Sequence, residues 1–315
     1  DHFETLVKEM LKILGYKKNT NNTDNIGDIY KEHPYIADVM EERGMNMSKL
    51  IVLGTGNAMV TNCYNTCFAV SCPNGEHILV DAGGGNGILV QMKKAKVEPN
   101  TIHHLIVTHE HCDHLLGVVW VVRKIGTMML GNKYAGQLHI YCHPALCETI
   151  VTLATLTLQK KFVNLFGDRI ILHSIENGTK MELAGQKVEF FDIYSTKAPQ
   201  FGFSMVTAEG KKVTCLGDEP YNPLCRSFVE GSEWLLCEAF CLYSQRDRFK
   251  PYEKHHSTVR EACQLAQELE IPHLVLWHTE DENYSQRKTM DMEEGLGYYN
   301  GDLHVPYDLE EIVLI

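Results

Sequence analysis

The distribution of hydrophobic residues changes near residue 49. From there on, short apolar runs bounded by turn-forming residues alternate with longer stretches in which apolar residues recur at helical spacing. Short apolar runs predict buried strands, and helical spacing predicts helices packed by one face. We predict strands at 50–53, 67–72, 77–80, 105–107, 138–141, 170–173, 188–194, 201–207, 213–216, 234–237 and 274–277, and helices at 115–125, 145–158, 258–269 and 285–292. This alternation in two halves predicts an α/β sandwich with its sheets inside and its helices outside.

Residues 1–48 follow a different pattern, with apolar positions at helical spacing in 3–14 and a second helical stretch at 36–43. We interpret them as a helical N-terminal extension to a single domain spanning 49–315. The amphipathic spacing leaves two roles open, because an apolar helix face can pack against the domain or a second copy, or can cover a substrate cleft.

Composition narrows the class of protein. The 315 residues include 44% hydrophobic residues, which excludes a disordered chain, and the formal net charge is −12. An acidic balance argues against an extended nucleic-acid interface, which needs clustered Lys and Arg, but allows a small phosphorylated substrate. The longest apolar run, 115–122, is far shorter than the roughly 20 residues that cross a bilayer, so we expect no membrane partner. The odd, scattered set of 11 cysteines predicts reduced thiols and a cytoplasmic protein.

Four metal-binding side chains stand directly after the predicted strand at 105–107, namely His109, His111, Asp113 and His114. A loop at a strand end can direct such side chains into one cleft, with alternate residues facing the same way. Two neighbouring metal ions in such a cleft would activate water and neutralise an oxyanion. A solvated loop with chance histidines is the alternative, but this density of ligand types has no use in packing. Cys112 lies inside the motif, and we expect it to face away.

The pattern His-x-His-x-Asp-His resembles the signature of the metallo-β-lactamase superfamily. The resemblance runs from about residue 50 to the C-terminus and implies the αββα fold, with metal ions at the sheet edge between the two halves. Further features resemble the ribonuclease Z-like branch. Asp218, in a Gly-Asp pair after strand 213–216, matches a bridging carboxylate, and His278, after strand 274–277, matches the last ligand. The implied metal ligands are His109, His111, Asp113, His114, Asp218 and His278.

The same resemblance implies catalytic roles for His256 and Asp113. His256 opens a His-Ser-Thr element whose histidine is the proposed general acid of the branch. A histidine titrates near neutral pH and can protonate a leaving alkoxide. The structural alternative for this element is helix capping by Ser257 or Thr258. Asp81, in Asp-Ala-Gly, resembles a family carboxylate that supports the metal loop, and the loop 54–58 resembles the family's first loop.

The sequence departs from the branch in two places. Thr196 stands where a further histidine ligand is expected, and a hydroxyl is a poor ligand beside imidazole. One metal position could then bind weakly, stay empty, or use His143 or His173 instead. The branch's protruding tRNA-binding arm also has no counterpart, because 167–185 has the pattern of a short hairpin. The chain therefore looks closer to arm-less phosphodiesterases such as the anti-Pycsar cyclic-nucleotide phosphodiesterases, and tRNA is the less favoured substrate.

These patterns predict a metal-dependent hydrolase acting on a small phosphodiester or cyclic nucleotide. Two alternatives stay open: hydrolysis of a carboxylic or sulfate ester or lactone, and a metal-binding protein with reduced activity. We expect one or two divalent ions, with zinc first, although Mn, Fe and Ni also suit His and Asp donors. We further expect a homodimer, to which the N-terminal extension could contribute.

Overall fold

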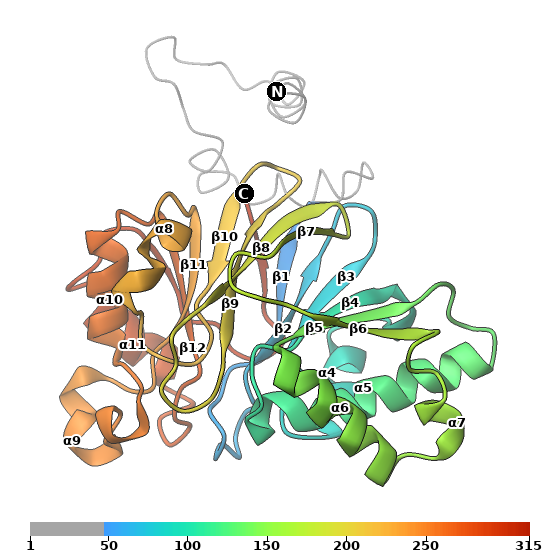
Figure 1. Cartoon of the computed structure of the whole chain (residues 1–315). Coiled ribbons are helices and arrows are strands. Elements are labelled where there is room, and N and C mark those ends of the chain that lie inside the picture. Colours follow the sequence, from blue (N-terminus) through green and yellow to red (C-terminus); the bar gives the residue numbers. More distant parts are fainter. Residues whose placement is uncertain (1–46) are drawn as a thin grey trace, which may run out of the picture.

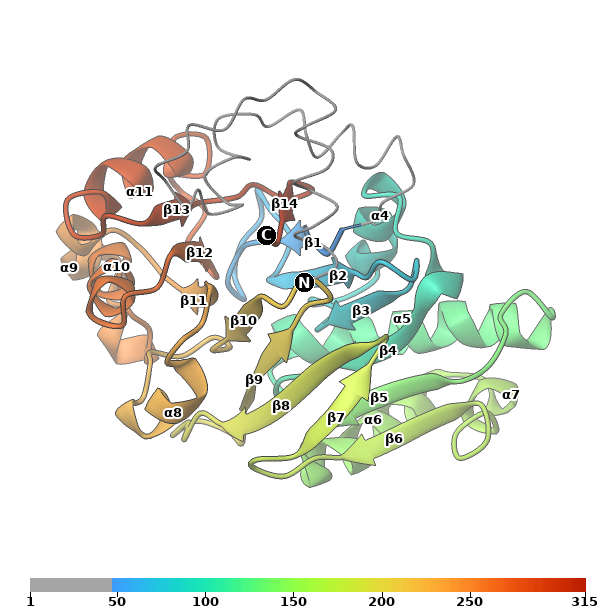
Figure 2. The same cartoon turned by 90° about the horizontal axis from the view of Figure 1, so that it is seen from above.

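The computed structural model describes residues 47–315, so the helices predicted at 3–14 and 36–43 lie outside the described residues. Two seven-stranded sheets pack face to face in this part of the chain. Figures 1 and 2 show the helices on the two outer faces, with α4–α7 covering one sheet and α8, α10 and α11 beside the other. This is the predicted αββα sandwich.

The first sheet has the strand order β14-β1-β2-β3-β4-β5-β6. A turn at 73–75 makes a hairpin of β2 and β3, and Gly75 has the positive φ that this turn requires. The elements of this half are β1 (Lys49–Gly54), β2 (Cys67–Ser71), β3 (His77–Val80), α4 (Gly87–Lys94), β4 (Ile102–Ile106), α5 (Cys112–Leu130), β5 (Leu138–Cys142), α6 (Pro144–Thr157), α7 (Lys160–Val163) and β6 (Ile170–Ser174), with β14 (Glu311–Val313) added from the C-terminus.

The second sheet has the order β13-β12-β11-β10-β9-β8-β7, and its strands β10 to β13 run parallel. Its elements are β7 (Lys180–Leu183), β8 (Gln186–Asp192), β9 (Phe201–Val206), β10 (Lys212–Cys215), α8 (Arg226–Val229), β11 (Trp234–Glu238), α9 (Arg246–Phe249), α10 (Val259–Glu268), β12 (His273–Trp277), α11 (Arg287–Gly295) and β13 (Asp302–His304). None of the helices within 47–315 has the length and apolar character needed to cross a bilayer.

The two sheets are joined by a core of alternating strand residues. Phe68 of β2 stacks on Trp277 of β12 with ring centroids 4.8 Å apart, and both side chains are buried. Full burial of a large apolar side chain contributes about 1.5–3 kcal/mol. This packing fixes the carboxyl ends of β4, β10 and β12 relative to one another, where the functional loops begin.

The predicted strands and helices of this part of the chain are all present, but the hairpin predicted at 167–185 is wrong. β6 belongs to the first sheet, while β7 pairs with β8 in the second. The chain crosses between the sheets at 175–179, where Ile175 is buried. Two neighbouring apolar runs give no information about which sheet each one joins. The hydrophobic pattern also did not predict helices α4, α7, α8 and α9 or strands β13 and β14.

A group of histidines on the first sheet predicts a pH-dependent stability. His104, His139 and His173 lie on adjacent strands, and Nδ1 of His139 is 2.9 Å from Nε2 of His173. Burial, and then the neighbouring histidines, lower the pKa of His104 from 6.5 to about 4. The unfolded chain therefore binds more protons between pH 6.5 and 4, and the free energy of unfolding should fall as the pH falls through this range.

We expect the variant His104→Gln to lose less stability than the wild type between pH 7 and pH 5 in urea unfolding. Loss of bound metal at acid pH would affect both proteins equally, so the difference between their pH slopes isolates the histidine group. Parallel slopes would contradict this account.

Candidate metal centre

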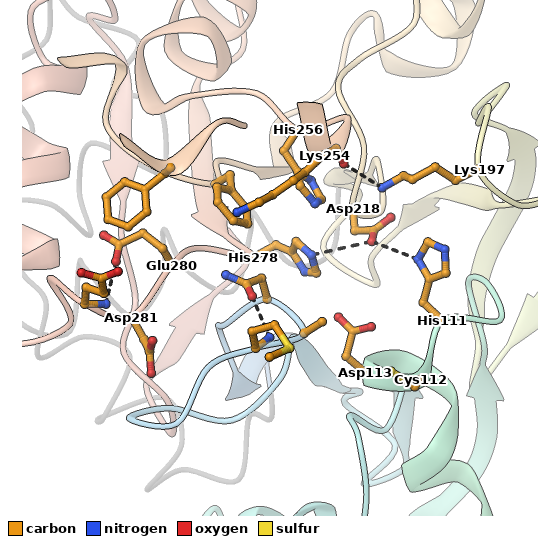
Figure 3. Close-up of a pocket in the computed structure, with 16 residues that line it drawn as sticks. His111, Cys112, Asp113, Lys197, Asp218, Lys254, His256, His278, Glu280 and Asp281 are labelled. Atoms are coloured by element: carbon orange, nitrogen blue, oxygen red, sulfur yellow. Dashed lines mark hydrogen bonds and ion pairs between the residues drawn. The ribbon is translucent and has the colours of Figure 1, made fainter. Parts of the chain in front are cut away.

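The predicted metal ligands lie beyond the carboxyl ends of three strands, on loops and, for Asp113 and His114, in the first turn of α5. The loop after β4 holds His109 and His111 and leads into α5, which begins at Cys112. Asp218 follows β10, and His278 follows β12. Polar side chains from both halves therefore meet at one edge of the sandwich, and Figure 3 shows the pocket that they line.

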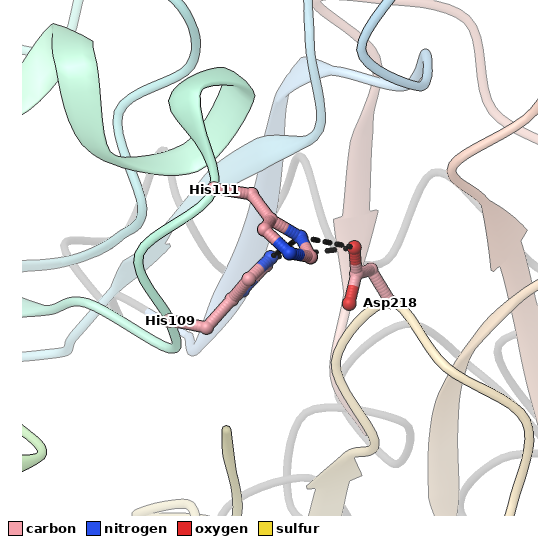
Figure 4. Close-up of side chains that lie close together, drawn as sticks. All are labelled: His109, His111 and Asp218. Carbon is pink, nitrogen blue, oxygen red and sulfur yellow. Dashed lines mark hydrogen bonds and ion pairs between the residues drawn. The ribbon is translucent and has the colours of Figure 1, made fainter. Parts of the chain in front are cut away.

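A first cluster consists of His109, His111 and Asp218, whose donor atoms lie within 4.8 Å of one another. Oδ2 of Asp218 is 3.3 Å from Nε2 of His109 and 3.8 Å from Nδ1 of His111. Figure 4 shows the two rings directed at the carboxylate. His109 is completely buried, whereas His111 is partly open to the pocket.

A second cluster consists of Asp113, His114 and His278, and its donor atoms meet the same distance limit. Oδ2 of Asp218 is also 3.8 Å from Nε2 of His114 and 3.6 Å from Nε2 of His278. One carboxylate oxygen therefore faces four imidazoles from both clusters. Asp218 therefore lies within reach of both clusters, and its bridging role stays a prediction.

The donor set fits divalent metal ions. Nε2 of His114 and Oδ1 of Asp218 are buried and have no hydrogen-bond partner among the described residues, which is costly unless another ligand satisfies them. Burial alone would raise the pKa of Asp218, but His109, His111 and His278 outweigh it and hold that pKa well below its ordinary value. The carboxylate is thus ionised, and its nitrogen and oxygen neighbours suit zinc and related ions.

Asp81 positions the segment that carries the metal ligands after β4. Its carboxylate accepts hydrogen bonds from the backbone N–H and the hydroxyl of Thr108, and its Oδ2 is 2.8 Å from Nδ1 of His114. Burial lowers the pKa of His114, but Asp81 more than offsets this and raises it to about 9. A carboxylate on the far nitrogen fixes the ring and makes Nε2 a stronger metal donor. The structure thus places Asp81 as the resemblance implied.

Helix α5 contacts the Asp81 loop through Gly117. Its N–H donates to the carbonyl of Gly83, and a Cβ at Gly117 would overlap the carbonyl oxygen of Ala82. Ala ordinarily favours a helix over Gly by about 1 kcal/mol, but here the backbone must move, at a cost of roughly 1–3 kcal/mol. We expect Gly117→Ala to lower thermal stability and to weaken metal binding, measured by calorimetric titration.

Gly126→Ala is the matched control in the same helix. A Cβ there would meet the side chains of Leu165 and Phe162 at 3.1 Å, and these can adjust. Equal metal affinity in the two variants would show that the contact at Gly117 does not position the ligands.

His256 lies beside the second cluster, and its ring centroid is 5.2 Å from that of His278. The ring stacks on Phe240, and its Nδ1 is 3.4 Å from Oε2 of the fully buried Glu238. Oε1 of Glu238 accepts from the backbone N–H of Ser257, which ties the His-Ser-Thr element to the end of β11. The element also caps α10, because Thr258 forms a capping box with Glu261.

The pocket in front of the clusters has a volume of about 460 Å³. Figure 3 shows Lys197 and Lys254 on its His256 side and Asp281 at its other end. Nζ of Lys197 is 3.3 Å from the carbonyl oxygen of Lys254, and Nζ of Lys254 lies 4.5 Å from the ring centroid of Phe240. The pocket thus combines the metal ligands with two amines and an aromatic wall.

The comparisons with known proteins agree with this geometry. A family model described as Anti-Pycsar protein Apyc1 matches residues 48–295, which is most of the chain.

The chain belongs to the Anti-Pycsar protein Apyc1 family.

Relatives named Ribonuclease Z are similar over most of their length. The Ribonuclease Z of Thermococcus gammatolerans is 26% identical over 308 residues, covering 80% of this chain and 92% of that protein. The Ribonuclease Z of Bacteroides thetaiotaomicron is 22% identical over 279 residues, covering 74% of this chain and 86% of that protein.

Solved structures share the fold. The metallo-beta-lactamase fold protein YhfI from Bacillus subtilis superposes with a TM-score of 0.69 at 16% identity, covering 85% of this chain and 99% of that one. Human tRNase Z, short form, superposes with a TM-score of 0.63 at 21% identity, covering 85% of this chain and 99% of that one. A diphosphatase from the PhnP family superposes with a TM-score of 0.64 at 16% identity, covering 84% of this chain and 97% of that one. The protein is a metal-dependent, phosphodiesterase-like hydrolase of the metallo-β-lactamase fold.

In this Apyc1-family protein the six predicted metal ligands are brought together, and His256 faces the same pocket. Neither histidine considered as a substitute for the missing ligand belongs to one of the two clusters. His143 caps α6 by accepting from the N–H of Ala145, and His173 pairs with His139. Thr196 is exposed, with its hydroxyl 3.4 Å from Nδ1 of His255. The first cluster thus has three donors among the described residues.

Several residues of the site were not predicted from the sequence. Glu238 could have been noticed, because it is the one charged residue of the buried strand β11. Lys197 and Lys254 carry no local signal, because they meet only through the fold. Cys112 was expected to face away, but it is exposed and lines the pocket. All 11 cysteines of the chain are unpaired.

Proposed function

We propose that this protein hydrolyses a small phosphodiester, with a cyclic nucleotide as the preferred class, using zinc in the two clusters. The observation that carries the proposal is the position of His256 beside two donor clusters that share Asp218. Hydrolysis of a phosphodiester requires groups that bind the charged phosphoryl oxygens and a group that protonates the leaving oxygen. The pocket contains candidate residues for both roles.

The metal ions, when bound, would polarise the phosphoryl oxygens and activate water. Asp218 would hold an ion in each cluster through its shared carboxylate. His256 would donate a proton to the leaving oxygen, and its ring stacks on Phe240 with Nδ1 3.4 Å from Oε2 of Glu238. Lys197 and Lys254 would offset the negative charge of the phosphate.

Pocket size and charge favour a small substrate over tRNA. A volume of about 460 Å³ is in the range of sites for small ligands. Glu280, Asp281 and Glu282 line the same pocket and would repel a long phosphate backbone.

A substrate panel tests the proposal. Zinc-loaded protein should hydrolyse bis(p-nitrophenyl) phosphate and at least one cyclic nucleotide, and should leave p-nitrophenyl acetate, nitrocefin and precursor tRNA nearly unchanged. Hydrolysis of the acetate or of nitrocefin alone would mean that the protein is a carboxylic ester or lactam hydrolase and not a phosphodiesterase. Cleavage of precursor tRNA alone would overturn the small-substrate part.

We also propose a homodimer. Exposed apolar side chains on two neighbouring helices, Leu116 and Trp120 of α5 and Leu156 of α6, support it, because a second copy would remove them from water. The pocket lies beside the first turn of α5, so such a contact would adjoin the metal loop.

A further inference from the structure

A third group of metal-binding side chains lies away from the pocket. His273 is the first residue of β12, and Asp302 and His304 are the first and last residues of β13. We call these three residues the far cluster. Their donor atoms lie within 4.8 Å of one another, the same limit that the two catalytic clusters meet.

The distances within the far cluster are compatible with one bound metal ion. Oδ2 of Asp302 is 3.2 Å from Nδ1 of His273 and 3.3 Å from Nε2 of His304. Two ligands that bind one tetrahedral zinc ion at about 2.0–2.1 Å are about 3.3 Å apart. The parallel pairing of β12 with β13 places these side chains together, since His273 is opposite Asp302 and Val275 is opposite His304.

Burial gives a second, independent observation. Nε2 of His304 is buried and makes no hydrogen bond within the part of the chain that the structure describes. Trp234 covers the cluster, because its ring stacks on His273 at a centroid distance of 4.1 Å and lies 5.2 Å from His304. The carboxylate of Asp302 lies within ion-pair distance of this nitrogen but forms no hydrogen bond with it. A buried polar atom without a hydrogen bond is costly unless a ligand satisfies it.

We propose that the far cluster binds one divalent transition-metal ion, of the zinc class, through His273, Asp302 and His304. Two imidazoles and a carboxylate are a ligand set for zinc, with a fourth position left for water. Asp302 is partly exposed, with 34% of its side chain accessible, so an ion can enter.

The ion would be structural. His273 begins the five-residue strand β12 and the predicted ligand His278 directly follows it, which at about 3.3 Å per residue separates the two centres by roughly 16 Å. The far cluster is also outside the pocket that contains His256. Its ion would join β13, the outermost strand of this sheet among the described residues, to β12 and so hold the edge of the sheet.

The test compares the full chain with the variant His304→Gln, which keeps a polar side chain but removes one ligand. After purification without chelator and reloading with zinc, the wild type should hold about one more zinc per chain than the variant, by plasma mass spectrometry. Zinc at about 100 times its dissociation constant should raise Tm by about 5 °C more in the wild type. Turnover should stay within about twofold.

Two further variants keep the result interpretable. Asp302→Asn changes a partly exposed residue and should lose the same zinc ion, even if His304→Gln folds poorly. His255→Asn removes an exposed histidine and should change neither the zinc content nor the Tm shift. Equal zinc content and equal Tm shifts in the wild type and in folded Asp302→Asn would overturn the proposal.

Discussion

Replacing His256 with Asn should lower kcat for a phosphodiester with an alkoxide leaving group by about 10²–10⁴-fold and leave metal content unchanged. The reason is chemical. An alkoxide such as a ribose oxygen needs a proton to leave, and His256 is the imidazole at the pocket that is fixed by Glu238 and Phe240 rather than placed among the metal donors. A p-nitrophenolate leaves without a proton, so bis(p-nitrophenyl) phosphate should lose less than about tenfold.

The matched control is His255→Asn. His255 is the neighbouring residue, is exposed, and has a positive φ that Asn tolerates. The control should retain turnover on both substrates, with kcat and KM measured for each. Equal losses on the two substrates for His256→Asn would mean that His256 acts in binding or folding instead of proton transfer, and unchanged turnover would remove it from the mechanism.

Replacing Asp218 with Asn should have a still broader effect, with turnover lowered at least about 10³-fold and the ions of both catalytic clusters lost. Oδ2 of Asp218 faces His109, His111, His114 and His278, so the substitution removes a charged donor from both clusters. An amide carries no charge and binds zinc poorly compared with a carboxylate.

The measurement is zinc content per chain together with turnover on bis(p-nitrophenyl) phosphate. Asp302→Asn serves as the reciprocal variant, because it should keep full turnover while Asp218→Asn loses it. If Asp218→Asn retained both its zinc and its turnover, the shared carboxylate would not be the bridging ligand, and the two clusters would have to function independently.

Most strands and helices, and the four metal ligands of one loop, could be predicted from local sequence patterns. The strands were recognisable because buried runs such as 274–277 contain no polar residue. His109, His111, Asp113 and His114 were found because all four stand in one short loop. Asp218 and His278 are more than a hundred residues away in the chain, and only the family resemblance selected them.

The rest depends on contacts that the linear pattern does not encode. Glu238 meets His256 only because residues 256–258 run along the end of β11. His273 and Asp302 come together only through the pairing of β12 with β13, a short strand that the sequence reading did not predict. The apolar runs of β6 and β7 look alike, yet they belong to different sheets.

The crossing at 175–179 divides the metal ligands between two contiguous segments of the polypeptide. The segment before it carries His109, His111, Asp113 and His114, and the segment after it carries Asp218 and His278. The later segment also supplies β14 to the sheet of the earlier one, so the two interlock. A chain cut at this crossing would yield two inactive fragments, and metal-dependent turnover on mixing them would report their reassembly, as in a split-enzyme complementation assay.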